Sequence, residues 1–122
     1  MEKPRKILVV DDEPGVLRLF EKILVAGGYD VVTAENGKQA LELMRKSDLS
    51  LVVLDISMPE PDGIEVLQYI RGHAPGLRVL AVSGFMGGAL LEPSRVLGAT
   101  AALNKADAPD KLLNEVNDLL KW

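Results

Sequence analysis

The chain of 122 residues has no cysteine, a single histidine and few aromatic residues, which make up 4% of the sequence. Without cysteine it can form no disulfide framework, no thiolate zinc site and no cysteine nucleophile. It also has no excess of basic charge, because 18 acidic residues outnumber 14 basic ones and the net charge is −4 at pH 7. This balance argues against direct binding of nucleic acid, which requires a clustered basic face.

Long hydrophobic runs are missing as well. The first apolar run, Ile7–Val10, ends at an acidic pair and is far too short for the hydrophobic region of a signal peptide. No later run approaches the roughly 20 apolar residues that a membrane span needs. We therefore expect a cytoplasmic protein with no membrane segment. The content of 48% hydrophobic and 26% charged residues is typical of a globular chain, and we expect residues 1–122 to form one domain.

The sequence instead alternates short apolar runs with longer segments of helical periodicity. The expected strands are Ile7–Val10, Asp30–Thr33, Leu51–Leu54, Leu77–Val82 and Thr100–Leu103. A segment with helical spacing of apolar residues follows each of them. Five strand–helix pairs in succession predict an α/β fold, with a parallel sheet, right-handed crossovers and helices on both faces.

Local signals set the expected helix boundaries. Asp12 is the expected N-cap of the first helix, and Gly27 with Gly28 ends that helix. Asn36 and Gly37 open the second helix. Three glycines between residues 84 and 88 predict a mobile segment ahead of a weaker helix that closes near residue 98.

Polar residues stand where four of the five predicted strands end. They are Asp11 with Asp12, Asp55, Ser83 and Lys105. In an open parallel sheet, ligands bind outside the carboxyl ends of the strands. The order of elements therefore brings three carboxylates, a hydroxyl and an ammonium to one edge.

The negative charges of three neighbouring carboxylates must be compensated. At an effective dielectric constant of about 20, two unit charges 4 Å apart repel by about 4 kcal/mol. Protons or a cation must offset this, and oxygen ligands without His or Cys suit Mg²⁺. Mg²⁺, a lysine and a serine hydroxyl together could hold a phosphoryl group, and a carboxylate can serve as its nucleophilic acceptor.

The segments LVVDDEP, VVLDISMPEPDG, VLAVSG and ATAALNK together resemble the receiver domain of bacterial two-component response regulators. The resemblance runs from Ile7 to the last helix. It implies a flavodoxin-like, doubly wound (βα)5 fold with strand order 2-1-3-4-5. No output domain follows the receiver in this chain, which we expect to be either free-standing or a segment of a longer protein.

The resemblance also implies roles for the residues at the strand ends. Asp55 would be the phosphoacceptor, Ser83 would hydrogen-bond the phosphoryl group and Lys105 would pair with it. The domain would catalyse its own phosphorylation and dephosphorylation without being a conventional turnover enzyme.

The metal ligands implied by the resemblance form a second set. Asp12 and Asp55 would bind Mg²⁺, Asp11 would bind it largely through water, and the backbone carbonyl of Ser57 would add a further ligand.

The implied phosphodonor is a sensor histidine kinase or a histidine phosphotransfer protein. The implied receivers of the signal are a downstream effector protein or domain, or a second copy of the phosphorylated chain. Two departures affect the output: the family usually has an aromatic switch residue where Ala102 stands, and a proline after a cis peptide where Ala106 stands.

Two alternatives remain open at the level of sequence. The first is a receiver-like binding module that works without phosphate, which the missing aromatic residue favours. The second is a small aspartate-nucleophile phosphatase, which the serine at position 57 disfavours because those enzymes have an acidic residue there.

Overall fold

The computed structural model describes residues 4–58, 63–84 and 98–121. Five parallel strands form one sheet in the order β2-β1-β3-β4-β5. The strands are β1 (Lys6–Val10), β2 (Asp30–Ala34), β3 (Leu51–Asp55), β4 (Arg78–Ser83) and β5 (Ala101–Asn104). Both the parallel arrangement and the strand order confirm the predicted flavodoxin-like fold.

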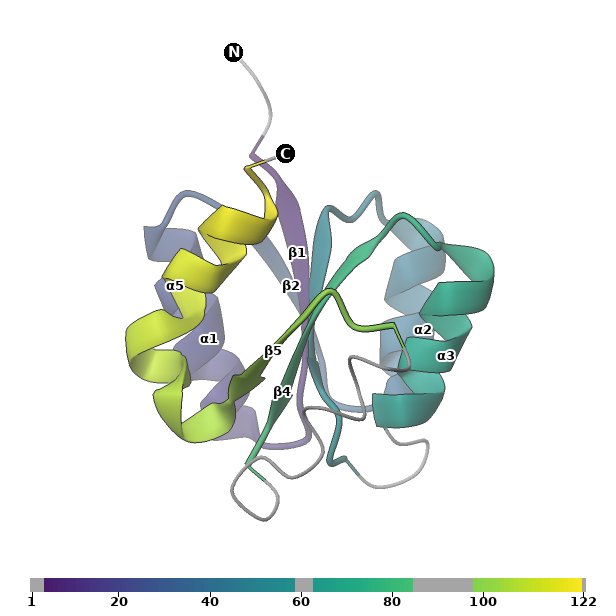
Figure 1. The fold of residues 1–122 in the computed structure, drawn as a ribbon, viewed down its shortest axis with the longest axis horizontal. Helices are drawn as coiled ribbons and strands as arrows, with labels where there is room; N and C mark the ends of the chain where they lie inside the picture. The colour runs from purple at the N-terminus through teal and green to yellow at the C-terminus, as the bar shows by residue number, and fades with distance from the viewer. Residues whose placement is uncertain (1–3, 59–62, 85–97, 122) are drawn as a thin grey trace.

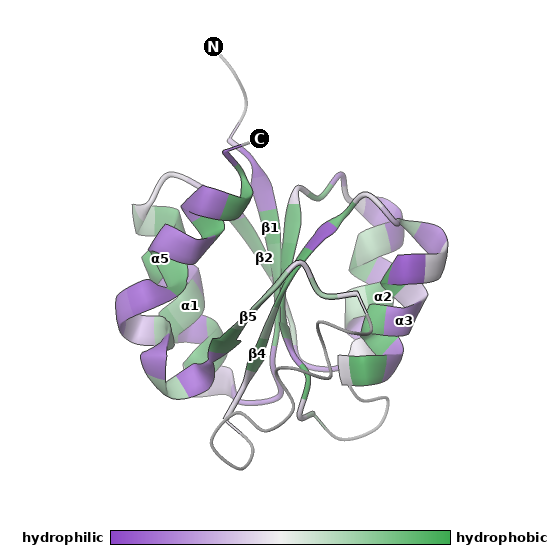
Figure 2. Ribbon diagram, in the orientation of Figure 1, coloured by the Kyte–Doolittle hydropathy of each residue, from purple (hydrophilic) through white to green (hydrophobic). Residues whose placement is uncertain are grey.

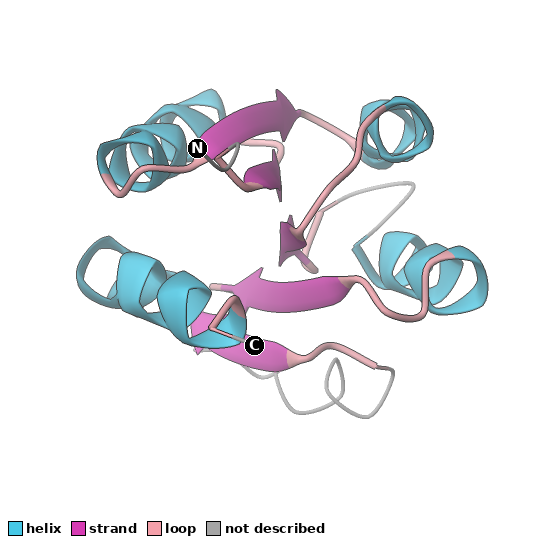
Figure 3. Ribbon diagram, turned by 90° about the horizontal axis from the view of Figure 1, so that it is seen from above, coloured by secondary structure: helices cyan, strands magenta, loops and turns pink. Residues whose placement is uncertain are grey.

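Helices cover both faces of the sheet. Helices α1 (Pro14–Ala26) and α5 (Ala108–Leu119) pack on one face, and α2 (Gly37–Lys46) and α3 (Gly63–His73) pack on the other (Figures 1 and 3). Within the described ranges, no helix is long and apolar enough to cross a membrane. Most of the expected glycine-rich mobile segment, and the helix expected after it, fall in residues 85–97, outside the described residues.

Alternation along the buried strands divides the core into two clusters, one on each face of the sheet. Ile7 and Val9 of β1 belong to the cluster under α1 and α5, whereas Leu8 and Val10 belong to the cluster under α2 and α3. Since successive strand residues point to opposite faces, a strand buried on both sides has an unbroken apolar sequence. The helices turn their hydrophobic sides toward the sheet (Figure 2).

The first helix begins one residue later than predicted. Glu13, not Asp12, is its N-cap, because the Glu13 carbonyl accepts the first helical hydrogen bonds and its backbone is extended. Pro14 then fits the first helical position, where a missing N–H costs nothing. The predicted opening of the second helix at Asn36 and Gly37 is confirmed: Asn36 is the N-cap, and its side chain accepts a hydrogen bond from the N–H of Gln39.

A close backbone approach places the start of α3 against the end of β3. A Cβ atom on Gly63 would lie 2.3 Å from the backbone oxygen of Asp55 and 2.3 Å from Cα of Ile56. Neither atom can move without displacing the buried end of the strand. Glycine at position 63 is therefore required by the contact that supports the backbone of Asp55.

We predict that Gly63→Ala destabilises the fold by about 1–3 kcal/mol, since the added methyl group meets rigid backbone. Gly72→Ala in the same helix is the matched control. Nothing lies within 4 Å of its added Cβ, and alanine should stabilise the helix there by roughly 0.5–1 kcal/mol. Urea unfolding of the two variants checks this, and equal stabilities would contradict the close-approach argument.

Candidate functional site

Three charged residues lie at the carboxyl edge of the sheet on the side of α1 and α5. Asp11 follows β1, Asp55 ends β3, and Lys105 opens a short 3-10 helix, η2 (Lys105–Asp107), directly after β5. Asp55 continues the row of Leu51 and Val53, which face α1 and α5. Alternation along the strands thus directs these side chains toward one another, as the strand-end argument predicted.

The three predicted carboxylates do converge. Asp11, Asp12 and Asp55 each offer one oxygen atom, and these atoms lie within 4.8 Å of one another. Asp11 and Asp55 are buried, with 1% and 3% of their surface exposed, whereas Asp12 is exposed. The cluster is therefore closed on the protein side and open toward solvent at Asp12.

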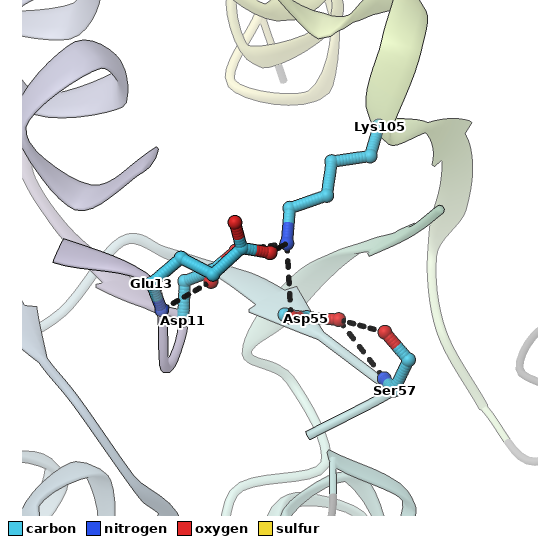
Figure 4. A network of polar contacts seen from close by, with 5 residues as sticks. All are labelled: Asp11, Glu13, Asp55, Ser57 and Lys105. Atoms are coloured by element: carbon cyan, nitrogen blue, oxygen red, sulfur yellow. Dashed lines mark hydrogen bonds and ion pairs between the residues drawn. The ribbon is translucent and has the colours of Figure 1, made fainter. Parts of the chain in front are cut away.

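Lys105 compensates the charge of this cluster. Its Nζ lies 2.9 Å from Oδ2 of Asp11, 3.2 Å from Oδ2 of Asp55 and 2.9 Å from Oε1 of Glu13 (Figure 4). The lysine side chain is 16% exposed. One ammonium thus binds two buried carboxylates of the predicted site and a third carboxylate that sequence reasoning missed.

The burial of Asp11 changes its acidity. Burial is the largest influence and raises the pKa of Asp11 from 3.8 to about 6, although the hydrogen bonds from Lys105 and from the Glu13 backbone oppose it. For Lys105, burial alone would lower the pKa. The hydrogen bonds to Asp11 and Glu13, together with the charge of Asp55, outweigh burial and raise the pKa above its ordinary value. Lys105 therefore stays charged at neutral pH.

Ser57 fixes the carboxylate of Asp55 from the side opposite Lys105. Its backbone N–H and its hydroxyl both donate to Oδ1 of Asp55, at 2.9 and 2.6 Å (Figure 4). Oδ2 of the same carboxylate accepts from Lys105. The prediction for Ser57 was a metal ligand through its backbone carbonyl, and these two hydrogen bonds were not predicted. Its spacing of two residues from Asp55 is the local signal that could have indicated them.

The loop that carries Lys105 is held by a side chain instead of a proline ring. The side chain of Asn104 accepts a hydrogen bond from the N–H of Ala106 at 3.0 Å. A proline at position 106 could not donate that bond. Asn104 thereby caps η2 and fixes the backbone at Lys105. This explains how the charged site tolerates one of the two departures from the family pattern.

Ser83 and Ala102 lie on the other face of the sheet. Ser83 is fully buried and ends β4 in the row of Val79 and Ala81, which face α2 and α3. Ala102 pairs with Ala81 and is partly buried against the same cluster. The structure therefore places Ser83 at the predicted edge, but on the face opposite Asp55.

A cavity of about 540 Å³ lies at the other end of the sheet. Its lining includes Ser50, which directly precedes β3, Arg78, which begins β4, and His73, which ends α3. It is thus remote from the carboxyl ends of the strands, where the charged residues meet. We assign the chemistry to the charged cluster, since ionic groups and not cavity size are what metal and phosphoryl binding require.

Comparison with known proteins identifies the family. The model of the response regulator receiver domain matches residues 7–117. The chain belongs to this family, the phosphoacceptor domains of two-component systems. Its fold is similar to a CheY-like receiver domain protein from Methanospirillum hungatei, with a TM-score of 0.89, 28% identity and coverage of 98% of this chain and 95% of that one.

Three further relatives extend the comparison. Sporulation initiation phosphotransferase F of Bacillus subtilis is 32% identical over 94% of this chain and 93% of that protein. The response regulator TrrA of Thermotoga maritima, solved in complex with Mg²⁺ and BeF, has 34% identity, a TM-score of 0.84 and coverage of 95% and 99%. The transcriptional regulatory protein GlrR of Escherichia coli is 33% identical over 98% of this chain, which spans only 27% of the length of GlrR.

The raised pKa of Asp11 predicts a pH-dependent effect of Asp11→Asn on stability. The folded chain holds the Asp11 proton more tightly than the unfolded chain, so its ionisation costs stability. This cost in stability is absent below pH 3.8, grows as the pH rises from 3.8 to about 6, and is complete above about pH 6. Without divalent ions, Asp11→Asn should raise the free energy of unfolding by about 1–3 kcal/mol near neutral pH. Near pH 4 the gain should largely vanish. Urea unfolding in chelator at both pH values checks this, and a gain of equal size at both would be inconsistent with it.

Proposed function

We propose that this receiver domain accepts a phosphoryl group on Asp55 from a phosphohistidine, with Mg²⁺ held by the acidic cluster, and so switches a protein-binding surface. The observation that carries the proposal is the pairing of a buried Asp55 with Lys105 beside two further carboxylates. The buried carboxylate is the nucleophile, and the ammonium beside it is in position to neutralise an arriving phosphoryl oxygen.

The transfer exchanges one bond to phosphorus for another. An oxygen of Asp55 attacks phosphorus, the phosphorus–nitrogen bond of the donor breaks, and the imidazole of the donor leaves and takes up a proton. Ser57 holds Oδ1 of Asp55 with two hydrogen bonds, which fixes the plane of the carboxylate before attack. Lys105 then binds the transferred group, and the proposed hydrogen bond from the Ser83 hydroxyl requires that side chain to turn from the opposite face of the sheet toward Asp55.

The donor set fits Mg²⁺. Asp11, Asp12 and Asp55 present carboxylate oxygens within reach of one ion, and an all-oxygen set is what Mg²⁺ prefers. The backbone carbonyl of Ser57 is a proposed further ligand. When bound, the ion supplies charge neutralisation for the carboxylates and for the phosphoryl oxygens. The ion and Lys105 would share the carboxylates of Asp11 and Asp55, because both cations bind oxygens of these two groups.

The phosphorylated state of Asp55 ends by hydrolysis. A water molecule attacks the phosphorus, the bond to the Asp55 oxygen breaks, and inorganic phosphate leaves with the carboxylate restored. The domain therefore contributes catalytic groups to its own phosphorylation and dephosphorylation, with each cycle returning the starting state.

The proposed donor is a sensor histidine kinase or a histidine phosphotransfer protein, and the proposed output is an effector protein or domain, or self-association of the phosphorylated form. Since Ala102 has no ring to reorient, an aromatic switch at that position cannot transmit the signal. The expectation of a cytoplasmic location stays a prediction.

Asp55→Asn tests the assignment of the phosphoacceptor. We expect the wild-type protein to gain one phosphoryl mass when incubated with acetyl phosphate and Mg²⁺, and the variant to gain none while remaining folded, because an amide is not a nucleophile here. Asp118→Asn on α5, away from the acidic cluster, should be phosphorylated like the wild type. Intact-mass spectrometry decides this. A folded wild type that gains no phosphoryl group would instead favour the phosphate-independent binding module.

Lys105→Ala separates metal binding from phosphoryl binding. Without the ammonium, the three carboxylates lose their internal counter-ion, so we predict tighter binding of Mg²⁺ but little retention of the phosphoryl group. Isothermal titration calorimetry with Mg²⁺ and phosphorylation by acetyl phosphate provide the two readings. Weaker Mg²⁺ binding in the variant would show that Lys105 does not compete with the ion.

A further inference from the structure

The side chain of Glu13 has a contact that its place in the fold does not require. Glu13 is the N-cap of α1, yet its side chain makes no capping hydrogen bond within the described part of the chain. It reaches instead to Lys105, which is 92 residues away in sequence, with Oε1 2.9 Å from Nζ (Figure 4). The contact joins the start of α1 to the loop after β5.

A count of hydrogen-bond donors shows what this contact implies. An ammonium has three N–H donors and no acceptor. Lys105 lies within 3.2 Å of three carboxylate oxygens, one each from Asp11, Glu13 and Asp55. Its donors are therefore all committed, so any phosphoryl oxygen that binds Lys105 must displace one of these partners.

The exposure of the three partners indicates which of them is displaced. The side chains of Asp11 and Asp55 are 2% and 3% exposed, whereas that of Glu13 is 64% exposed. A buried carboxylate that loses its counter-ion pays a large desolvation cost, but an exposed one is solvated by water at once. Mg²⁺ would compensate Asp11 and Asp55 but does not reach Glu13 in the acidic cluster of three. Glu13 is thus the partner that Lys105 exchanges for a phosphoryl oxygen.

We propose that Glu13 is a positioning residue that holds Lys105 in the unphosphorylated domain and competes with the phosphoryl group for it. This inference rests on the proposed function, because it assumes that Lys105 binds the phosphoryl group on Asp55. The contact with Glu13 keeps the ammonium at the mouth of the site, and it also opposes phosphorylation, since it must break before Lys105 can bind the new group.

Two substitutions at position 13 distinguish the effect of the Glu13–Lys105 contact from the effect of the negative charge of Glu13. Glu13→Gln removes the charge and weakens the ion pair. Glu13→Asp keeps the charge but is shorter by one methylene group, so it withdraws the carboxylate from Nζ. Phosphorylation is followed with acetyl phosphate at saturating Mg²⁺, and the affinity for beryllofluoride, which mimics the phosphoryl group without a donor, is measured in parallel. Glu42→Gln on α2, across the sheet, is the control for an equal change in net charge.

We expect both variants at position 13 to be phosphorylated about twofold to fivefold faster than the wild type and to bind beryllofluoride tighter by a similar factor, the range expected for one partly exposed ion pair. Glu42→Gln should behave like the wild type. Unchanged or slower phosphorylation of Glu13→Gln would overturn the proposal. So would a Glu13→Asp variant that matches the wild type, since charge alone would then explain the effect. If the wild type itself gains no phosphoryl group on Asp55, the proposed function fails. If the wild type is phosphorylated but substitutions at position 13 do not change the rate, only the inference about Glu13 fails.

Discussion

The site depends on the balance between one ammonium and the carboxylates around it. Asp11 and Asp55 are almost fully buried and close together, and they are stable there because Lys105 binds both. Burial still leaves Asp11 with a pKa of about 6, so the compensation is incomplete. An incompletely compensated cluster favours the binding of a divalent cation. A cation bound there would weaken the attraction between the carboxylates and the ammonium of Lys105. In the proposed mechanism, metal binding and phosphoryl binding would therefore be linked through Lys105.

The fold supplies this balance through the order of its strands. β1 and β3 are neighbours in the sheet although α1, β2 and α2 separate them in sequence, and this brings Asp11 and Asp55 to adjacent strand ends. Lys105 directly follows β5, at the far edge of the sheet, and its long side chain spans the remaining gap. Gly63 and Asn104 support the two loops at the backbone level, the first by allowing α3 to approach Asp55 and the second by capping η2.

Much of this arrangement could be predicted from sequence because it follows from the periodicity of the apolar residues and from the order of the strands and helices along the chain. Apolar runs that end in Asp11 and Asp55 predict buried strands with acids at one edge, and the motifs resemble those of receiver domains closely enough to predict the strand order. The interactions of Glu13 and Ser57 could not be predicted, since they depend on side-chain reach across loops. The helix start was misplaced by one residue because Asp12 and Glu13 are both acceptable before Pro14, and only the backbone hydrogen bonds distinguish them.

The departure at position 106 shows how local chemistry can preserve a site when a family residue is missing. Asn104 provides a hydrogen bond that a proline would have excluded, and Lys105 still reaches Asp11 and Asp55. Ala102 has no such replacement among the contacts described for β5, so the missing aromatic ring would affect the proposed output and not the proposed phosphoryl chemistry.

The most direct test of the central claim is a crystal structure of this protein with Mg²⁺ and beryllofluoride. We expect an ion bound by Asp11, Asp12 and Asp55, a beryllofluoride group on Asp55, and Nζ of Lys105 moved from Glu13 onto a fluorine atom. A structure in which Lys105 keeps Glu13 while the ion or the beryllofluoride binds elsewhere would contradict the central claim.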